Sequence, residues 1–125
     1  MEDIVAVLIV DDQAPFRRAA RAVVTATPGF EVVGEAESGE EAVQMVDALE
    51  PGLVLMDINL PGINGIEATR RITNAHPAAV VVLLSTYQMG DLPGDAEGCG
   101  AVAYVHKEDF GPALVQDAWS RRGAA

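Results

Sequence analysis

Cysteine, aromatic and basic residues are all scarce in this chain of 125 residues. The single cysteine, Cys99, cannot form an internal disulfide, so we expect a reducing compartment, the cytoplasm, and a buried apolar role for this thiol. Eight basic residues accompany nineteen acidic ones, and the formal net charge is −11. A charge of this sign repels phosphate backbones and anionic lipid. We therefore expect no direct nucleic-acid binding by this chain and no membrane association.

Long apolar runs and nucleotide-binding motifs are also missing. The longest strongly apolar run, Ala78 to Leu84, is far shorter than the roughly 18 residues that a membrane-spanning helix needs. The acidic start Met1-Glu2-Asp3 differs from the basic start of a secretory leader. The absence of a G-x-x-x-x-G-K-S/T motif excludes a P-loop enzyme. Half of the residues are apolar, which is enough for one core, so we expect a single domain over residues 1–125.

Short apolar runs, spaced about 25 residues apart, are the main secondary-structure signal. They are rich in Val and Ile and lack polar alternation, which is typical of strands covered on both faces in a parallel sheet. The five predicted strands lie within Ile4 to Val10, Phe30 to Val33, Leu53 to Met56, Ala79 to Leu84 and Val102 to Val105.

Helical patterns lie between these runs. Ser38 and Glu41 form an S-x-x-E capping box for the second helix, and Asn64 is the expected cap of the third. The expected helices cover Pro15 to Ala26, the segment from Ser38 to Pro51, the segment from Asn64 to His76, and about residues 110–121. Gly90 to Gly100 is rich in Gly and Pro and predicts at most a short helix.

Alternating strands and helices predict a three-layer α/β fold. Right-handed crossovers lead to a doubly wound parallel sheet, and five strands favour the flavodoxin-like order 2-1-3-4-5. In such sheets the ligand site lies beyond the carboxyl ends of the strands. The residues at these ends are polar or charged: Asp11, Asp12, Asp57, Ser85 and Lys107.

Three carboxylates near one another require a cation. Two like charges about 4 Å apart repel by roughly 4 kcal/mol at an effective dielectric constant of 20. An open site of a few carboxylates suits Mg²⁺, which keeps several waters and binds phosphate oxygens. Asp57 ends the central strand and precedes a turn-rich loop, so it is the candidate nucleophile for a phosphoryl group. Ser85 and Lys107 can each contact a phosphoryl oxygen.

Four motifs extend this interpretation over nearly the whole chain. LIVDDQAPFRRA, LVLMDINLPGINGIEATRRI, LLSTYQ and GAVAYVHK resemble the sequence blocks of response-regulator receiver domains, in the order and at the spacing of that family. The sequences of the first and third motifs are most similar to those of receivers that precede LuxR-type helix-turn-helix domains. The residues after Arg122 are too few to form such a domain, so the chain is either a stand-alone receiver or one without its effector.

The resemblance implies specific roles. Asp12 and Asp57 bind Mg²⁺ directly, Asp11 acts mainly through water, and the backbone carbonyl of Asn59 completes the protein ligands. Asp57 accepts a phosphoryl group from a sensor histidine kinase or a histidine phosphotransfer protein, and the chain is not otherwise an enzyme. A second copy of the chain is a candidate partner after phosphorylation.

The resemblance also implies a conformational switch. Ser85 and Tyr104 shift together on phosphorylation and bias an existing equilibrium between inactive and active states. Tyr104 is alternatively an edge aromatic of the core. In the family the fourth helix forms much of the output surface, and Gly90 to Gly100 departs from that pattern.

Other functions remain as alternatives. The first is a receiver-like docking module that acts without phosphorylation. A phosphatase of the haloacid-dehalogenase type needs an Asp-x-Asp arrangement, whereas Asp11 and Asp12 are adjacent and precede Gln13. A flavin-binding carrier needs a phosphate loop after the first strand, where Asp11 and Asp12 repel phosphate.

Overall fold

Five parallel strands form one sheet in the order β2-β1-β3-β4-β5. The computed structural model describes residues 4–86, 96 and 98–122. The strands are β1 (Val5–Val10), β2 (Phe30–Ala36), β3 (Leu53–Asp57), β4 (Val80–Ser85) and β5 (Ala103–His106). The predicted flavodoxin-like fold and its strand order are confirmed. Most of the weak segment, Gly90 to Gly100, lies outside the described residues, so the prediction of a short helix there stays a prediction.

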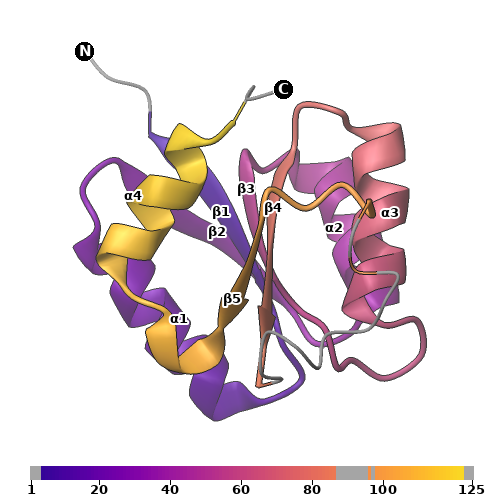
Figure 1. Ribbon diagram of the computed structural model, residues 1–125, viewed down its shortest axis with the longest axis horizontal. Coiled ribbons are helices and arrows are strands. Elements are labelled where there is room, and N and C mark those ends of the chain that lie inside the picture. Colours follow the sequence, from indigo (N-terminus) through magenta and orange to yellow (C-terminus); the bar gives the residue numbers. More distant parts are fainter. Residues whose placement is uncertain (1–3, 87–95, 97, 123–125) are drawn as a thin grey trace.

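Helices cover both faces of this sheet. Helices α1 and α4 lie on one face, and α2 and α3 lie on the other (Figure 1). Their bounds are α1 (Ala14–Ala26), α2 (Gly39–Leu49), α3 (Gly65–Ala75) and α4 (Pro112–Ser120), and a short 3-10 helix, η3 (Lys107–Asp109), follows β5. The sheet is thus the middle of three layers, as the sequence pattern predicts.

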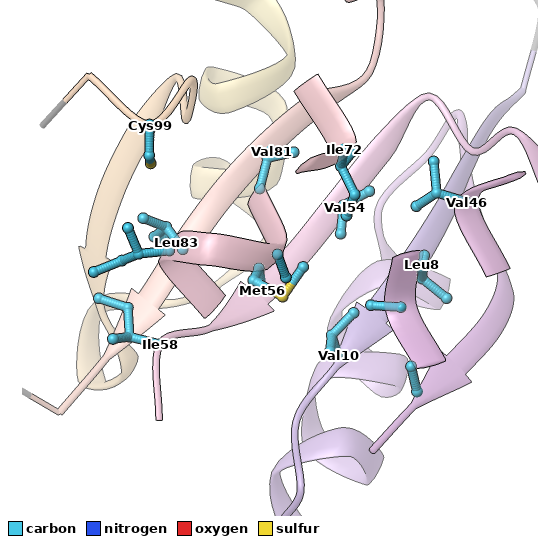
Figure 2. Close-up of a cluster of buried hydrophobic side chains, with 14 of the residues drawn as sticks. Leu8, Val10, Val46, Val54, Met56, Ile58, Ile72, Val81, Leu83 and Cys99 are labelled. Atoms are coloured by element: carbon cyan, nitrogen blue, oxygen red, sulfur yellow. The ribbon is translucent and has the colours of Figure 1, made fainter. Parts of the chain in front are cut away.

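Alternation along the central strands explains why they are apolar throughout. In β1, Val7 and Ile9 pack into the cluster beneath α1 and α4, whereas Leu8 and Val10 pack into the cluster beneath α2 and α3. Successive side chains of a strand point to opposite faces, so a sheet covered twice needs apolar residues at every position. Figure 2 shows the second cluster, where Val54, Met56, Val81 and Leu83 join Ile72 from α3 and Val46 from α2.

Cys99 belongs to the same cluster. Its thiol is free and 2% exposed. Its predicted role as a small apolar residue is therefore confirmed (Figure 2). Within the described part of the chain, no helix is both long and apolar enough to cross a membrane.

Side-chain caps begin the second and third helices where the sequence predicts them. The Ser38 hydroxyl accepts a hydrogen bond from the Glu41 backbone N–H at 3.1 Å, and the Asn64 side chain accepts one from the Glu67 N–H at 2.9 Å. In a capping box the Glu41 carboxylate would accept a hydrogen bond from the backbone N–H of Ser38. Here it accepts one from the N–H of the preceding residue, Glu37. These bonds satisfy donors that a helix start leaves without partners.

The last helix begins later than predicted. The sequence pattern places it at about residues 110–121, but α4 starts at Pro112 with the extended residue Gly111 as its N-cap. The preceding residues Lys107–Asp109 form η3, and the Phe110 N–H donates to the Lys107 carbonyl at the end of that turn. Phe110 and Gly111, which the apolar spacing assigned to the helix, are thus extended residues that end η3 and cap α4.

The edge strand β2 contains an irregularity. Val7 of β1 pairs with Val32, but the next residue, Leu8, pairs with Gly34, so Val33 is an extra residue in β2. The bulge bends the strand locally and shifts the pairing of β2 with β1 by one residue from Leu8 onward. On its other side β1 keeps an uninterrupted register with the central strand β3.

The cap of α2 can be tested by substitution. We expect Ser38→Ala to lower the free energy of unfolding by about 1 kcal/mol, because the Glu41 N–H loses its partner at the helix start. Urea denaturation of the metal-free protein measures the change. Ser120→Ala is the matched control: its exposed hydroxyl only donates to the Asp117 carbonyl near the end of α4, so its effect should stay within about 0.5 kcal/mol. Equal midpoints for the two variants would contradict the assignment.

Candidate phosphoacceptor site

The predicted functional residues lie at the carboxyl ends of neighbouring strands. Asp11 directly follows β1, Asp57 is the last residue of β3, Ser85 is the last residue of β4, and Lys107 follows β5 as the first residue of η3. In Figure 1 the strands run downward, so these ends lie along the lower edge of the sheet. The strand register places Asp57 opposite Leu84, the residue before Ser85. It also places Ser85 opposite His106, the residue before Lys107.

The three acids converge, as predicted. Asp11, Asp12 and Asp57 each offer a carboxylate oxygen, and these oxygens lie within 4.8 Å of one another. Asp11 is completely buried and Asp57 is 4% exposed, whereas Asp12 is exposed. Carboxylates at this spacing repel one another strongly unless positive charge lies between them. The cluster is therefore suited to a divalent cation that is reached from the side of Asp12.

Lys107 supplies positive charge on the protein side of the cluster. Its ammonium lies 2.6 Å from Oδ2 of Asp11 and 3.5 Å from Oδ1 of Asp57, and its side chain is 16% exposed. The other oxygen of Asp11, Oδ1, accepts a hydrogen bond from the backbone N–H of Gln13 at 2.8 Å. Both oxygens of Asp11 thus have protein partners, and Lys107 joins the ends of β1, β3 and β5.

Asp57 is held in an environment that disfavours its charge. Burial, followed by the charge of Asp11, raises the pKa of Asp57 to about 6, and the opposing effects of Lys107 and of the hydrogen bond from the Asn59 backbone N–H are smaller. An ordinary aspartate titrates near 3.8. The ionised form of Asp57 is therefore destabilised, and a cation bound at the cluster would stabilise it.

Backbone contacts hold the loops that carry the acids. The Arg17 guanidinium donates to the Asp11 carbonyl at 2.7 Å and to the Glu35 carboxylate at 3.2 Å, which joins the loop after β1 to β2. At the start of α3, Gly65 lies against the carbonyl of Asp57 so closely that a Cβ atom would collide with it. The loop that follows Asp57 can therefore turn back tightly over the end of β3.

Tyr104 lies on β5, three residues before Lys107. Its ring is partly buried against the cluster beneath α2 and α3, and its hydroxyl donates to the Ala96 carbonyl at 2.8 Å. The ring thus has a packing position in this conformation, and its role as a switch stays a prediction. His106 is held by backbone groups, because its Nε2 contacts the Thr86 carbonyl at 3.1 Å and its Nδ1 accepts from the Glu108 N–H at 3.1 Å.

Two aromatic residues near Lys107 were not singled out from the sequence. The Lys107 ammonium lies 4.5 Å from the ring centroid of Phe16, and this ring contacts Phe110 with a centroid distance of 6.0 Å. Phe16 occupies the apolar stripe of α1, so the helical pattern assigns it only to the core. The signal that could have found it is its place in the first turn after Asp11 and Asp12.

The fold and the site together define a class of protein. A five-stranded doubly wound sheet, with a buried aspartate at the end of its central strand beside two more acids and a lysine, is the arrangement of a receiver domain. Residues 7–118 match the response regulator receiver domain family, and the chain belongs to that family. Receiver domains of this family bind Mg²⁺, accept phosphoryl groups from histidine kinases and are not enzymes in the ordinary sense.

Known proteins of similar sequence include regulatory proteins. The chain is 36% identical over 115 residues to the transcriptional regulatory protein DegU of Brevibacillus brevis, which covers 92% of this chain and 49% of that protein. It is 38% identical over 101 residues to the response regulator GacA of Pseudomonas viridiflava, and this match covers 81% of this chain and 47% of that protein. The chain thus spans about half the length of these relatives.

A solved structure agrees with the fold. A two-component response regulator of the LuxR family from Aurantimonas sp. SI85-9A1 superposes with a TM-score of 0.85 at 34% identity, over 96% of this chain and 88% of that one. Together with the curated relatives, this match confirms the resemblance to receivers of LuxR-type regulators that the sequence motifs indicate.

The raised pKa of Asp57 predicts how stability depends on pH. The group binds its proton more tightly when folded, so the folded state loses stability as the pH rises from about 4 to about 6. In chelator, Asp57→Asn should therefore exceed the wild type in free energy of unfolding by about 2 to 3 kcal/mol at pH 8, and by much less at pH 4. Urea titrations at both pH values measure this difference. Asp109→Asn, an exposed carboxyl nearby, is the control; an Asp57→Asn advantage that does not change with pH would contradict the prediction.

Proposed function

We propose that this chain is a single phosphoacceptor receiver domain whose Asp57 takes a phosphoryl group from the phosphohistidine of a sensor histidine kinase or a histidine phosphotransfer protein. The observation that carries the proposal is the position of Asp57. It is buried at the end of the central strand, within 4.8 Å of the carboxylates of Asp11 and Asp12 and 3.5 Å from the Lys107 ammonium. A nucleophile needs such an environment because charge accumulates there when a phosphoryl group arrives.

The residues present fit Mg²⁺. The donor set is all oxygen, and the repulsion that raises the pKa of Asp57 favours a divalent ion. We assign Asp12, Asp57 and the backbone carbonyl of Asn59 as direct ligands. Asp11 is assigned to water-mediated contact, because both of its oxygens already have protein partners. Bound Mg²⁺ supplies charge neutralisation for the carboxylates and the phosphoryl oxygens.

The side chains divide the remaining work. A carboxylate oxygen of Asp57 attacks phosphorus; a P–O bond forms as the P–N bond to the donor imidazole breaks, and the electron pair leaves with the imidazole. Lys107 moves little to contact one phosphoryl oxygen, since its ammonium already lies beside the nucleophile. Ser85 on the adjacent strand donates a hydrogen bond to another oxygen. Slow hydrolysis of the acyl phosphate returns the carboxylate.

The signal is proposed to leave through Ser85 and Tyr104. These residues lie on the neighbouring strands β4 and β5, so a shift of Ser85 toward the phosphoryl group changes the space beside Tyr104. The Tyr104 ring then moves further inward and leaves its bond to the Ala96 carbonyl. This change favours the active member of an existing equilibrium and alters binding to an output partner or a second copy of the chain. We propose a cytoplasmic setting for these events.

Phosphorylation of Asp57 is directly testable. After incubation with a small acyl phosphate and Mg²⁺, intact-mass measurement should show one added phosphoryl group on the wild type. The group should be absent from Asp57→Asn, and chelation should suppress it, because both the nucleophile and charge neutralisation are needed. An unmodified wild type would favour the docking module that acts without phosphorylation.

Ser85 can be tested against a neighbouring hydroxyl. We expect Ser85→Ala to slow acyl-phosphate phosphorylation by about 10- to 100-fold, the value of one hydrogen bond to a charged oxygen. Thr86→Ala is the matched control, since its exposed side chain follows the end of β4. The time course of the mass change measures both rates. A loss of equal size in the two variants would remove the specific role of Ser85.

A further inference from the structure

The Lys107 ammonium has a third partner besides the two carboxylates. It lies over the face of the Phe16 ring, 4.5 Å from the centroid, and the lysine side chain is largely buried. The negative face of an aromatic ring attracts a cation, and the attraction grows when water is excluded. The ammonium is thus held between the ring on one side and the oxygens of Asp11 and Asp57 on the other.

The position of the Phe16 ring is itself fixed by the two loops of the site. The backbone N–H of Phe16 donates to the Gln13 carbonyl, and the Gln13 N–H donates to Asp11. Hydrogen bonds thus connect the backbone of Phe16 to the loop that carries the acids. The Phe16 ring is tilted by 50° against the ring of Phe110, whose N–H donates to the Lys107 carbonyl. The ring therefore joins the segment after β1 to the segment after β5, independently of the ion pair.

The ring and the carboxylates respond differently when the site is used. A divalent cation and a phosphoryl group interact with Asp11 and Asp57. The ion pairs between these carboxylates and Lys107 therefore weaken when the cation and the phosphoryl group are bound. The aromatic face is uncharged and lies outside that group of oxygens. It therefore keeps attracting the ammonium when the ion pairs rearrange.

We propose that Phe16 is a positioning residue that keeps the Lys107 ammonium beside Asp57 during phosphoryl transfer. This inference rests on the proposed function, because the position of Lys107 matters only if a phosphoryl group arrives at Asp57. Phe16 acts through Lys107 and does not touch the transferred group. Removal of the Phe16 ring should slow phosphorylation of Asp57. The affinity for Mg²⁺ should stay nearly unchanged, because none of the acids is altered.

Three variants separate the aromatic face from simple packing. Phe16→Leu removes the face and keeps an apolar side chain, whereas Phe16→Tyr keeps the face and serves as the rescue. Phe30→Leu is the matched control: Phe30 is also partly buried in the cluster beneath α1 and α4, and it pairs with Trp119 at 6.4 Å, away from Lys107. Urea denaturation of all three shows whether the two leucine variants are destabilised alike.

The first measurement needs neither metal nor phosphoryl donor. In chelator, the ¹H and ¹³C resonances of the Lys107 ε-methylene in the wild type should be shifted upfield by the ring current of Phe16. The shift should persist in Phe16→Tyr and Phe30→Leu and disappear in Phe16→Leu. An unshifted Lys107 resonance in the wild type would overturn the proposed contact.

The second measurement is the rate of phosphorylation by a small acyl phosphate at saturating Mg²⁺. We expect Phe16→Leu to react about 5- to 30-fold more slowly than the wild type, the range of one cation–π contact, and Phe16→Tyr and Phe30→Leu to stay within about twofold. Mg²⁺ affinity, measured by thermal shift, should change less than about twofold in Phe16→Leu. Equal slowing in both leucine variants would overturn the inference, as would a wild-type rate in Phe16→Leu.

The outcomes also separate this inference from the proposed function. A wild type that takes no phosphoryl group overturns the function and the inference together. A wild type that is phosphorylated on Asp57 while Phe16→Leu reacts equally fast overturns the inference alone.

Discussion

Repulsion among three carboxylates is the constraint around which this end of the molecule is built. The parallel sheet brings Asp11, Asp12 and Asp57 together, and two of them are almost without contact with solvent. Lys107 offsets part of their charge from the protein side, through a close pair with Asp11 and a longer one with Asp57. The remaining imbalance appears in the raised pKa of Asp57. In the absence of a cation the folded protein thus destabilises the ionised form of Asp57, and a cation bound at the site offsets this destabilisation.

The same lysine couples parts of the chain that are far apart in sequence. It follows β5 near the end of the chain, yet it contacts Asp11 and Phe16 after β1. Phe110 adds a further contact between these two segments. The loops after the first and last strands are thus packed as one unit at the edge of the sheet.

Much of this arrangement follows from sequence patterns, and the exceptions have physical causes. Continuous apolar runs predict a sheet covered on both faces, and polar residues at the strand ends predict the site. The capping signals at Ser38 and Asn64 predict the starts of α2 and α3. The start of α4 could not be read in this way, since apolar spacing does not reveal that Phe110 and Gly111 have extended backbones. Phe16 was missed for a similar reason, because a ring on an apolar stripe can also support a charge.

The extra residue Val33 in β2 indicates where this fold tolerates changes in chain length. A one-residue insertion in β1 would exchange the side chains of its two faces and disturb both hydrophobic clusters and the aspartates that follow. The edge strand has a neighbour on one side only, and it already accommodates one residue beyond the register of β1. Evolutionary insertions and deletions should therefore accumulate at the β2 edge, while the distance along the chain from Val5 to Asp12 stays constant among descendants of this sequence.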